Sequence, residues 1–379
     1  MDLIDRAGDL KRELVEYGQS PRLRRYLDAW LDDLFDGAMD EQRFIAMMDA
    51  FLMEHRLPDG DTVIDRFLHA RRDLDDTDRA ILTAWKDPVH GLFEVRTRDG
   101  DALDTFNLVD ELPYRMRSTM GSDPIAHIDA GMFLLGTVVA VGDEWMMSGA
   151  HQPFPAAARP EMRQTAMRLA MEFPRQVFRN PDKLARGWEL QTGQRDSFIE
   201  LFGADTIVVP GGKAHEKVRE FYRFDFDRRG HDPKNWREPG FDLDAITGEC
   251  DTVGIIFDPD DGLGYYLDFG AAQRAFATPK LVLQAFYREL ISGYLRDENT
   301  SPVPIRRLAE QDTAKASRLF QKLLKKPSFD WERDGEALLR WYKPGHFAGP
   351  PLPRSVPMDL TAEEAAPVTG PAAVRPLRR

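Results

Sequence analysis

Two histidines and an aspartate flank the most strand-like part of the sequence. His127 and Asp129 lie two residues apart, and His151 follows after two apolar segments. Imidazole and carboxylate groups act as general acids and bases, and they also bind divalent metal ions. If the two segments form a hairpin, the three side chains would meet at one end of a small barrel. This grouping predicts a hydrolase-type site, whereas ordinary turn residues are the interpretation that we favour.

A glycine-rich turn with one lysine lies between an apolar segment and an expected helix. Its residues are Gly211, Gly212 and Lys213. Backbone amides at the start of a helix, together with a lysine ammonium, can bind an anion. The turn is not a P-loop, because Ala214 stands where that motif has Ser or Thr, and no glycine lies five positions before Gly212. The three residues are candidates for an anion site, although a tight strand-to-helix turn is the favoured interpretation.

Two further features could suggest a metal site or a nucleophile, and neither has the required pattern. Residues 258–262 are rich in Asp and end on glycine at the fifth position, whereas an EF-hand loop has its glycine at the sixth. A hairpin turn explains this segment. Cys250 is the only cysteine and has two acidic neighbours, which disfavour a thiolate. We therefore predict no bound metal and no cofactor.

Charge is distributed unevenly along the chain. Residues 1–80 carry 12 Lys or Arg against 20 Asp or Glu, whereas residues 302–346 carry 10 against 6. A basic helix end with a nearby tryptophan could bind an acidic surface of the chain or of a partner. A solvated helix face is the simpler interpretation. The candidate partner-binding residues are Lys322, Lys325, Lys326 and Trp341.

The first part of the chain changes from helical to strand-like spacing. Apolar residues recur at helical intervals, with Asp or Thr at two expected helix starts, so residues 1–86 are predicted to form a helical module. From Pro88 onward, short alternating segments are separated by Gly and Asp turns. This pattern predicts a small antiparallel β-barrel over residues 87–153.

The second part is predicted to be a mixed α+β module over residues 154–348. Its expected elements are a helix, a strand-turn-helix unit, a hairpin and two long helices, over 159–178, 206–221, 252–269, 279–295 and 306–325. Prolines are dense in residues 349–379, which predicts a disordered or extended tail. The predicted fold class of the whole chain is therefore α+β.

Composition limits the possible environments and partners. The chain of 379 residues has a net charge of −13, which disfavours nucleic acid and anionic membranes as partners. Its single cysteine fits a reducing compartment. The first residues lack a basic segment followed by an apolar one, and no stretch approaches the roughly 20 apolar residues of a membrane span. These features predict a cytoplasmic protein that does not associate with membranes.

Four segments carry a resemblance to a known group of proteins. They are 56–62, 91–95, 136–149 and 202–210. In their succession they resemble a little-characterised group of bacterial cytosolic proteins, in which a helical module and a small barrel often accompany a SEC-C zinc motif. The resemblance covers roughly residues 40–345 and implies architecture rather than chemistry. Because the Cys and His ligands of the zinc motif are missing, no metal role follows from it.

Packing and turn signals fill the chain, whereas no complete catalytic motif is present. The sequence therefore favours a non-enzymatic binding or adaptor protein of the bacterial cytoplasm with a protein partner. A hydrolase using His127, Asp129 and His151 is the first alternative. An RNA-binding protein using the barrel and the basic C-terminal helix is the second, although the net charge disfavours it.

Overall fold

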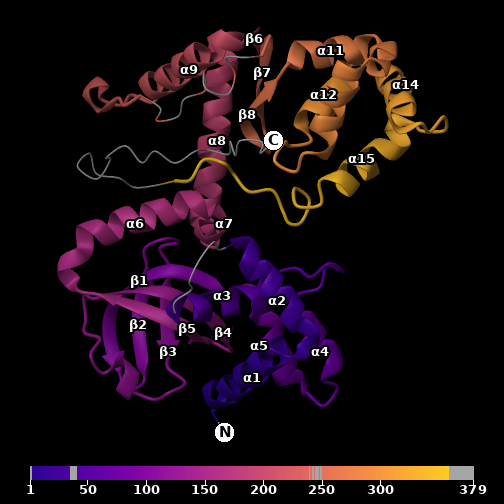
Figure 1. Cartoon of the computed structure of the whole chain (residues 1–379). Helices are drawn as coiled ribbons and strands as arrows, with labels where there is room; N and C mark the ends of the chain where they lie inside the picture. The colour runs from indigo at the N-terminus through magenta and orange to yellow at the C-terminus, as the bar shows by residue number, and fades with distance from the viewer. Residues whose placement is uncertain are drawn as a thin grey trace. The chain divides into compact units, whose positions relative to one another are not determined.

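The structure is a computed structural model of the chain (Figure 1), and it describes residues 2–34, 41–238, 240, 243, 247 and 250–357. The chain divides into two compact units, Met1–Asn180 and Pro181–Arg379. Each unit contains both helices and strands. The predicted α+β class is therefore confirmed.

Helices form the first part of the first unit, as the sequence predicted. Thr62 and Asp65 form a capping box at the start of one helix, and the carboxylate of Asp75 accepts the Asp78 N–H at the start of another. These caps satisfy amides that have no partner within the helix. The helices are α1 (Leu3–Gly18), α2 (Pro21–Leu34), α3 (Glu41–Met53), α4 (Val63–Ala70) and α5 (Asp76–Ala84).

Five strands follow, and their pairing closes on itself. Their order is β1-β2-β3-β5-β4, and β4 pairs with β1. An odd number of strands cannot alternate in direction all around a closed circuit, so one neighbouring pair must be parallel. That pair is β3 and β5, and the prediction of a wholly antiparallel sheet was wrong. The strands are β1 (Val89–Asp99), β2 (Ala102–Asn107), β3 (Pro113–Arg117), β4 (Phe133–Val141) and β5 (Glu144–Phe154).

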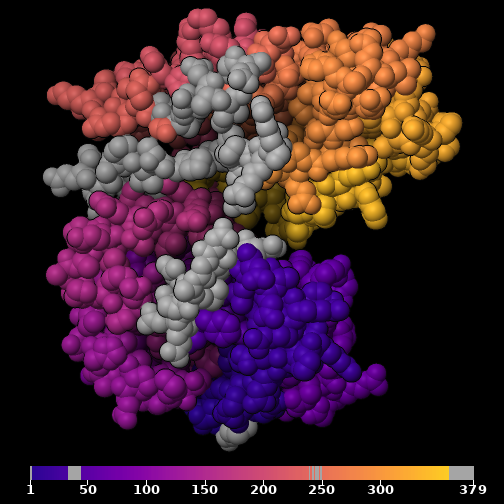
Figure 2. Space-filling model, viewed as in Figure 1, coloured from indigo at the N-terminus to yellow at the C-terminus, as the bar shows by residue number. Residues whose placement is uncertain are grey.

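The helices of the first unit share a hydrophobic core with parts of β4 and β5, and the strands contain a second apolar cluster of their own. Val139, Val141 and Met146 from β4 and β5 belong to the same buried cluster as the apolar faces of α1 to α5. The indole N–H of Trp85, just after α5, donates to the carbonyl of Ala140 at 3.1 Å. In Figure 2 the indigo surface of the helices adjoins the purple surface of the strands. This common core fixes α1 and α3 against β5.

Two more helices complete the first unit. They are α6 (Arg159–Glu172) and α7 (Pro174–Val177), over the range where the sequence predicted one helix. Arg159 at the start of α6 pairs with the buried carboxylate of Glu94 on β1 at 2.6 Å. Phe173 has a non-helical backbone and precedes Pro174, which explains why one predicted helix became two.

The second unit begins with a long helix and an antiparallel sheet. The strand order is β6-β7-β8, and β7 and β8 form the predicted hairpin around residues 258–262. The predicted strand-turn-helix unit is also confirmed. The elements are α8 (Pro181–Phe202), β6 (Thr206–Pro210), α9 (Ala214–Arg228), β7 (Thr252–Asp258) and β8 (Gly262–Leu267).

Both long helices predicted for the C-terminal region are interrupted. The first starts as a 3-10 helix, Pro279–Leu283, and Gln284 is extended before the α-helix begins. The second breaks at Asp312, whose carboxylate accepts the Lys315 N–H and so starts a new helix. The helices here are α11 (Phe269–Ala277), α12 (Ala285–Arg296), α13 (Val303–Glu310), α14 (Thr313–Leu324) and α15 (Trp331–Tyr342). Among the helices that the structure describes, none has the length and apolarity needed to cross a bilayer.

The proline-rich segment is anchored where the structure describes it. The Arg354 N–H donates to Oε1 of Gln191 on α8 at 2.7 Å, and the Ser355 hydroxyl donates to Gln194 at 2.5 Å. Pro353 and Pro357 are buried. Residues 353–357 therefore pack on their own unit without forming a helix or a strand. The rest of that prediction, residues 358–379, lies outside the described residues.

Candidate functional site

A cavity of about 310 Å³ opens in the first unit beside β5. Its walls come from α1, from the connection between β3 and β4, and from β4 and β5. Most of the lining is apolar and includes Met120, Ile128, Leu134, Met146 and Met147. The lining side chains with hydrogen-bonding groups are Lys11, Ser118, Thr119, His127, Ser148 and His151. A largely apolar cavity with a few converging polar groups is typical of a ligand site.

Three polar side chains form a closed triangle at one wall of this cavity. The ammonium of Lys11 donates to Asp49 Oδ1 at 2.6 Å and to Ser148 Oγ at 2.8 Å. The Ser148 hydroxyl donates to Asp49 Oδ2 at 2.7 Å. Asp49 and Ser148 are 5% and 3% exposed, and the Lys11 side chain is 16% exposed, so the triangle is largely removed from water. Burial lowers the pKa of Lys11, and the neighbouring Asp49 carboxylate opposes this shift.

The backbone of β5 is shaped to receive the carboxylate of this triangle. A bulge separates the pairs Leu135–Gln152 and Thr137–Ser148, so extra residues of β5 lie opposite Gly136. Gly149 in this bulge has φ of +71°, and a Cβ there would approach Asp49 Oδ2 to 2.8 Å. Only glycine combines this backbone conformation with this close approach.

His151 completes the bulge and has a buried nitrogen without a partner. Its ring lies over Gly136, where a Cβ would come within 2.4 Å of the imidazole. Among the described residues, its Nε2 atom is one of the few buried polar atoms that make no hydrogen bond. Burial lowers the pKa of His151, and the Gly149 carbonyl and Asp49 oppose the shift. Because unpaired buried polar atoms are costly, this nitrogen marks a place where a ligand group would gain a hydrogen bond.

The sequence-predicted site is only partly assembled. His127 and His151 both line the cavity, His127 from the connection between β3 and β4 and His151 from β5. Asp129 is not among the lining residues, and its backbone N–H contacts the Met132 sulfur at 3.3 Å. The geometry therefore brings the two histidines to one cavity without the aspartate that a general acid–base set would need. Lys11, Asp49 and Ser148 were not predicted.

The Gly211-Gly212-Lys213 segment forms a closely packed turn in the second unit. The Gly211 N–H donates to the carbonyl of Asp251 at 3.2 Å, and its own carbonyl accepts the Thr247 hydroxyl at 3.2 Å. The ammonium of Lys213 pairs with Glu216 at 2.7 Å. Two of the groups expected to hold an anion, the Gly211 amide and the Lys213 ammonium, thus have protein partners already.

The basic C-terminal residues lie at the end of α14, whereas Trp341 lies near the end of α15. Lys322 is in the last turn of α14 and Lys325 caps it, positions where positive charge is favourable to the helix dipole. Trp331, at the start of α15, stacks on Phe320 of α14. Trp341 is 79% exposed and, from the rise of an α-helix, lies roughly 15 Å farther along α15. Lys322, Lys325 and Lys326 therefore do not share a compact surface with Trp341.

The acidic hairpin turn and the single thiol have local structural partners. Asp258 Oδ1 accepts the N–H groups of Asp260 and Asp261 at 3.0 and 3.2 Å, which closes the turn. The thiol of Cys250 contacts the Thr247 carbonyl, and burial raises its pKa. Within the described ranges, no three His, Cys, Asp or Glu side chains are grouped to hold a metal ion.

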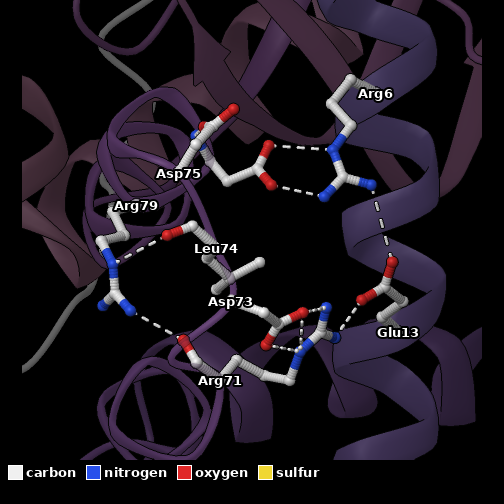
Figure 3. Close-up of polar contacts among 8 residues, drawn as sticks. Arg6, Glu13, Arg71, Asp73, Leu74, Asp75 and Arg79 are labelled. Atoms are coloured by element: carbon white, nitrogen blue, oxygen red, sulfur yellow. Dashed lines mark hydrogen bonds and ion pairs between the residues drawn. The ribbon is translucent and has the colours of Figure 1, made fainter.

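A second polar cluster joins α1 to α5 and to the segment before it (Figure 3). The Arg6 guanidinium pairs with both carboxylate oxygens of Asp78, and it lies 3.6 Å from Glu13. Glu13 also pairs with Arg71, which in turn binds Asp73 at 2.7 Å. Each of these five side chains has a partner of opposite charge, and the Arg79 guanidinium beside them donates to the backbone carbonyls of Leu74 and Arg71. This is typical of a structural connection between helices rather than of a ligand site.

A shallower cavity of about 360 Å³ lies elsewhere in the first unit, and its polar groups are paired. Arg179 binds the Asp87 carboxylate at 2.7 Å, and the Tyr114 hydroxyl donates to Asp110 at 2.5 Å. Burial raises the pKa of Tyr114, which keeps this phenol protonated. The cavity beside β5 is therefore the stronger candidate. Among the described residues, its lining includes a buried nitrogen without a hydrogen-bond partner, and the lining of the shallower cavity does not.

Comparison with known proteins finds no relative of this chain. The chain matches no family model, no curated protein and no solved structure. The resemblance to the bacterial cytosolic group accordingly stays a prediction from the sequence. Functional inference therefore depends on the chemistry of the cavity itself.

Acidification is expected to destabilise the first unit through His151. Because its folded pKa is below the ordinary 6.5, the unfolded chain binds a proton at pH values where the folded protein does not. The free energy of unfolding should consequently fall as the pH decreases below about 6.5. Urea unfolding of the wild type and His151→Phe, compared from about pH 5 to about pH 7.5, measures this contribution.

The free energy of unfolding of His151→Phe should still fall as the pH decreases, but less steeply than that of the wild type. His55 and His346, whose pKa values burial also lowers, shift stability in the same direction and are unchanged in the variant. Equal slopes for the two proteins would mean that His151 has the same proton affinity in both states.

Proposed function

We propose that the first unit binds a small organic molecule in the cavity beside β5, without transforming it. The closed circuit of strands would act as a small barrel that holds the ligand at one end, next to α1. The observation that supports this most directly is the unpaired, buried Nε2 of His151, a residue that lines this largely apolar cavity. The cavity volume lies near the lower end of the roughly 300–1,000 Å³ of ligand pockets, which favours a small ligand.

The contacts of Ser148 favour binding over hydrolysis. A serine nucleophile needs a neighbouring base with a free lone pair to take its proton. Here the Lys11 ammonium donates to Ser148 Oγ, and the Ser148 hydroxyl donates to Asp49. These hydrogen bonds connect α1, α3 and β5, and they leave the Ser148 hydroxyl without a base to activate it. The hydrolase alternative, RNA binding, a protein partner and a cytoplasmic location remain predictions from the sequence.

Methionine methyl groups provide a local probe of the proposed site. In protein with ¹³C-methyl methionine, toluene is expected to shift the signals of Met146 and Met147, which line the cavity. Signals of Met162 and Met167 on α6, which do not line it, should move much less. The chain has 14 methionines, and Met→Leu variants assign the signals.

Gly8→Phe offers a way to close the cavity from α1. Gly8 lines it, and a Cβ there would contact only the exposed Thr119, at 3.3 Å. The variant is expected to fold and to lose the toluene response, whereas Glu16→Phe, on the same helix but outside the lining, should keep it. The proposal is wrong if toluene leaves Met146 and Met147 unshifted in the wild type, or shifts them equally in Gly8→Phe.

A further inference from the structure

The Lys11 ammonium has one donor left for a ligand. An ammonium carries three N–H donors. Two are directed to Asp49 Oδ1 and Ser148 Oγ, and Lys11 also lines the cavity. The third N–H is therefore free to donate to an acceptor atom on a ligand. In the part of the chain that the structure describes, these two are the hydrogen bonds of the Lys11 ammonium.

The polar wall of the cavity has no net charge. Lys11 and Asp49 form an ion pair and so neutralise each other. Burial keeps His151 neutral near pH 8, since it lowers the pKa of this group. His127, the other titratable group at the cavity, is exposed at its edge. A charged ligand group would thus be buried without a counter-charge, which is costly.

We propose that the cavity selects an uncharged head group with both a donor and an acceptor, such as a primary carboxamide, on a small apolar body. The carbonyl oxygen would accept the free Lys11 N–H, and the NH2 group would meet Nε2 of His151. The apolar body would contact Met146, Met147 and Ile128. This inference rests on the proposed binding function and specifies the ligand class of the same site.

Benzamide, benzoate and toluene separate the possible head groups, because they share an aromatic ring. At pH 8, benzamide is expected to bind the wild type about fivefold to tenfold more tightly than toluene, the gain of roughly one net hydrogen bond. Benzoate should bind more weakly than benzamide, because its charge has no partner. Affinities come from titrations that follow the methyl signals of Met146 and Met147.

His151→Phe keeps an aromatic ring and removes the nitrogen. It should lose the preference for benzamide over toluene, which is the ratio of the two affinities within this one variant. His69→Phe is the matched control, since His69 is exposed near the end of α4 and does not line the cavity. Its preference for benzamide should equal that of the wild type.

A measurement on the wild type avoids dependence on any variant. In ¹⁵N-histidine-labelled protein, benzamide is expected to shift the Nε2 signal of His151, whereas toluene should change it little. Benzoate binding as tightly as benzamide, or a benzamide preference that persists in His151→Phe, would overturn the inference while leaving the binding function intact. If none of the three probes shifts Met146 or Met147, the binding function itself fails.

Discussion

Replacing Asp49 with alanine is expected to lower the free energy of unfolding by about 3 to 5 kcal/mol. The change leaves the buried Lys11 ammonium without its carboxylate and the Ser148 hydroxyl without its acceptor. Removing one partner of a buried pair is costly because the remaining charge stays out of water. Urea unfolding followed by circular dichroism measures the difference.

An exposed ion pair provides the control for Asp49→Ala. Asp28 pairs with Arg24 one turn away on α2 at 3.1 Å, and both side chains are more than half exposed. Asp28→Ala should change stability by no more than about 0.5 kcal/mol. The double variant Lys11→Met/Asp49→Leu should recover most of the loss, because it removes both charges. An Asp49→Ala cost as small as that of Asp28→Ala would contradict the buried triangle.

The helices of the first unit were predictable because their signals are local. Apolar spacing and capping residues such as Thr62 and Asp75 act within a few positions of the chain. β3 was not predicted, since it is short, begins with Pro113 and alternates apolar residues with two arginines. Its place between β2 and β5 depends on pairing with distant strands, which local spacing does not encode.

The candidate site was only half predictable for a related reason. His127 and His151 were expected at one end of the barrel, and both line the cavity. The contact between Asp49 and Ser148 spans 99 positions, and the bulge at Gly149 makes room for it. One signal was available, because Asp49 is a lone carboxylate within the apolar segment of α3. A buried charge implies a partner, but the sequence does not show which residue it is.

In the C-terminal region, the sequence contained a signal for a helix break, but the apolar spacing led to the prediction of one continuous helix. The apolar spacing continues through residues 306–325, which favoured one helix. Asp312 and Thr313 interrupt this pattern with residues that start helices, and the carboxylate of Asp312 caps α14. The side chain thus competes with the backbone for the same amide and allows the chain to turn.

Gly211→Ala is expected to destabilise the second unit by about 3 kcal/mol, near the upper end of the cost of overpacking. A Cβ at this position would come within 2.2 Å of the Cys250 carbonyl and 2.3 Å of the Thr247 carbonyl, and backbone atoms cannot rotate away. Gly212 has no neighbouring atom within 4 Å of its Cβ position, so Gly212→Ala should change stability by less than about 0.5 kcal/mol. Urea unfolding of both variants tests whether these glycines serve packing or ligand binding. Two results together would instead support an anion site at this turn. Inorganic phosphate would stabilise the wild type but not Lys213→Gln, and Gly211→Ala would change stability only slightly.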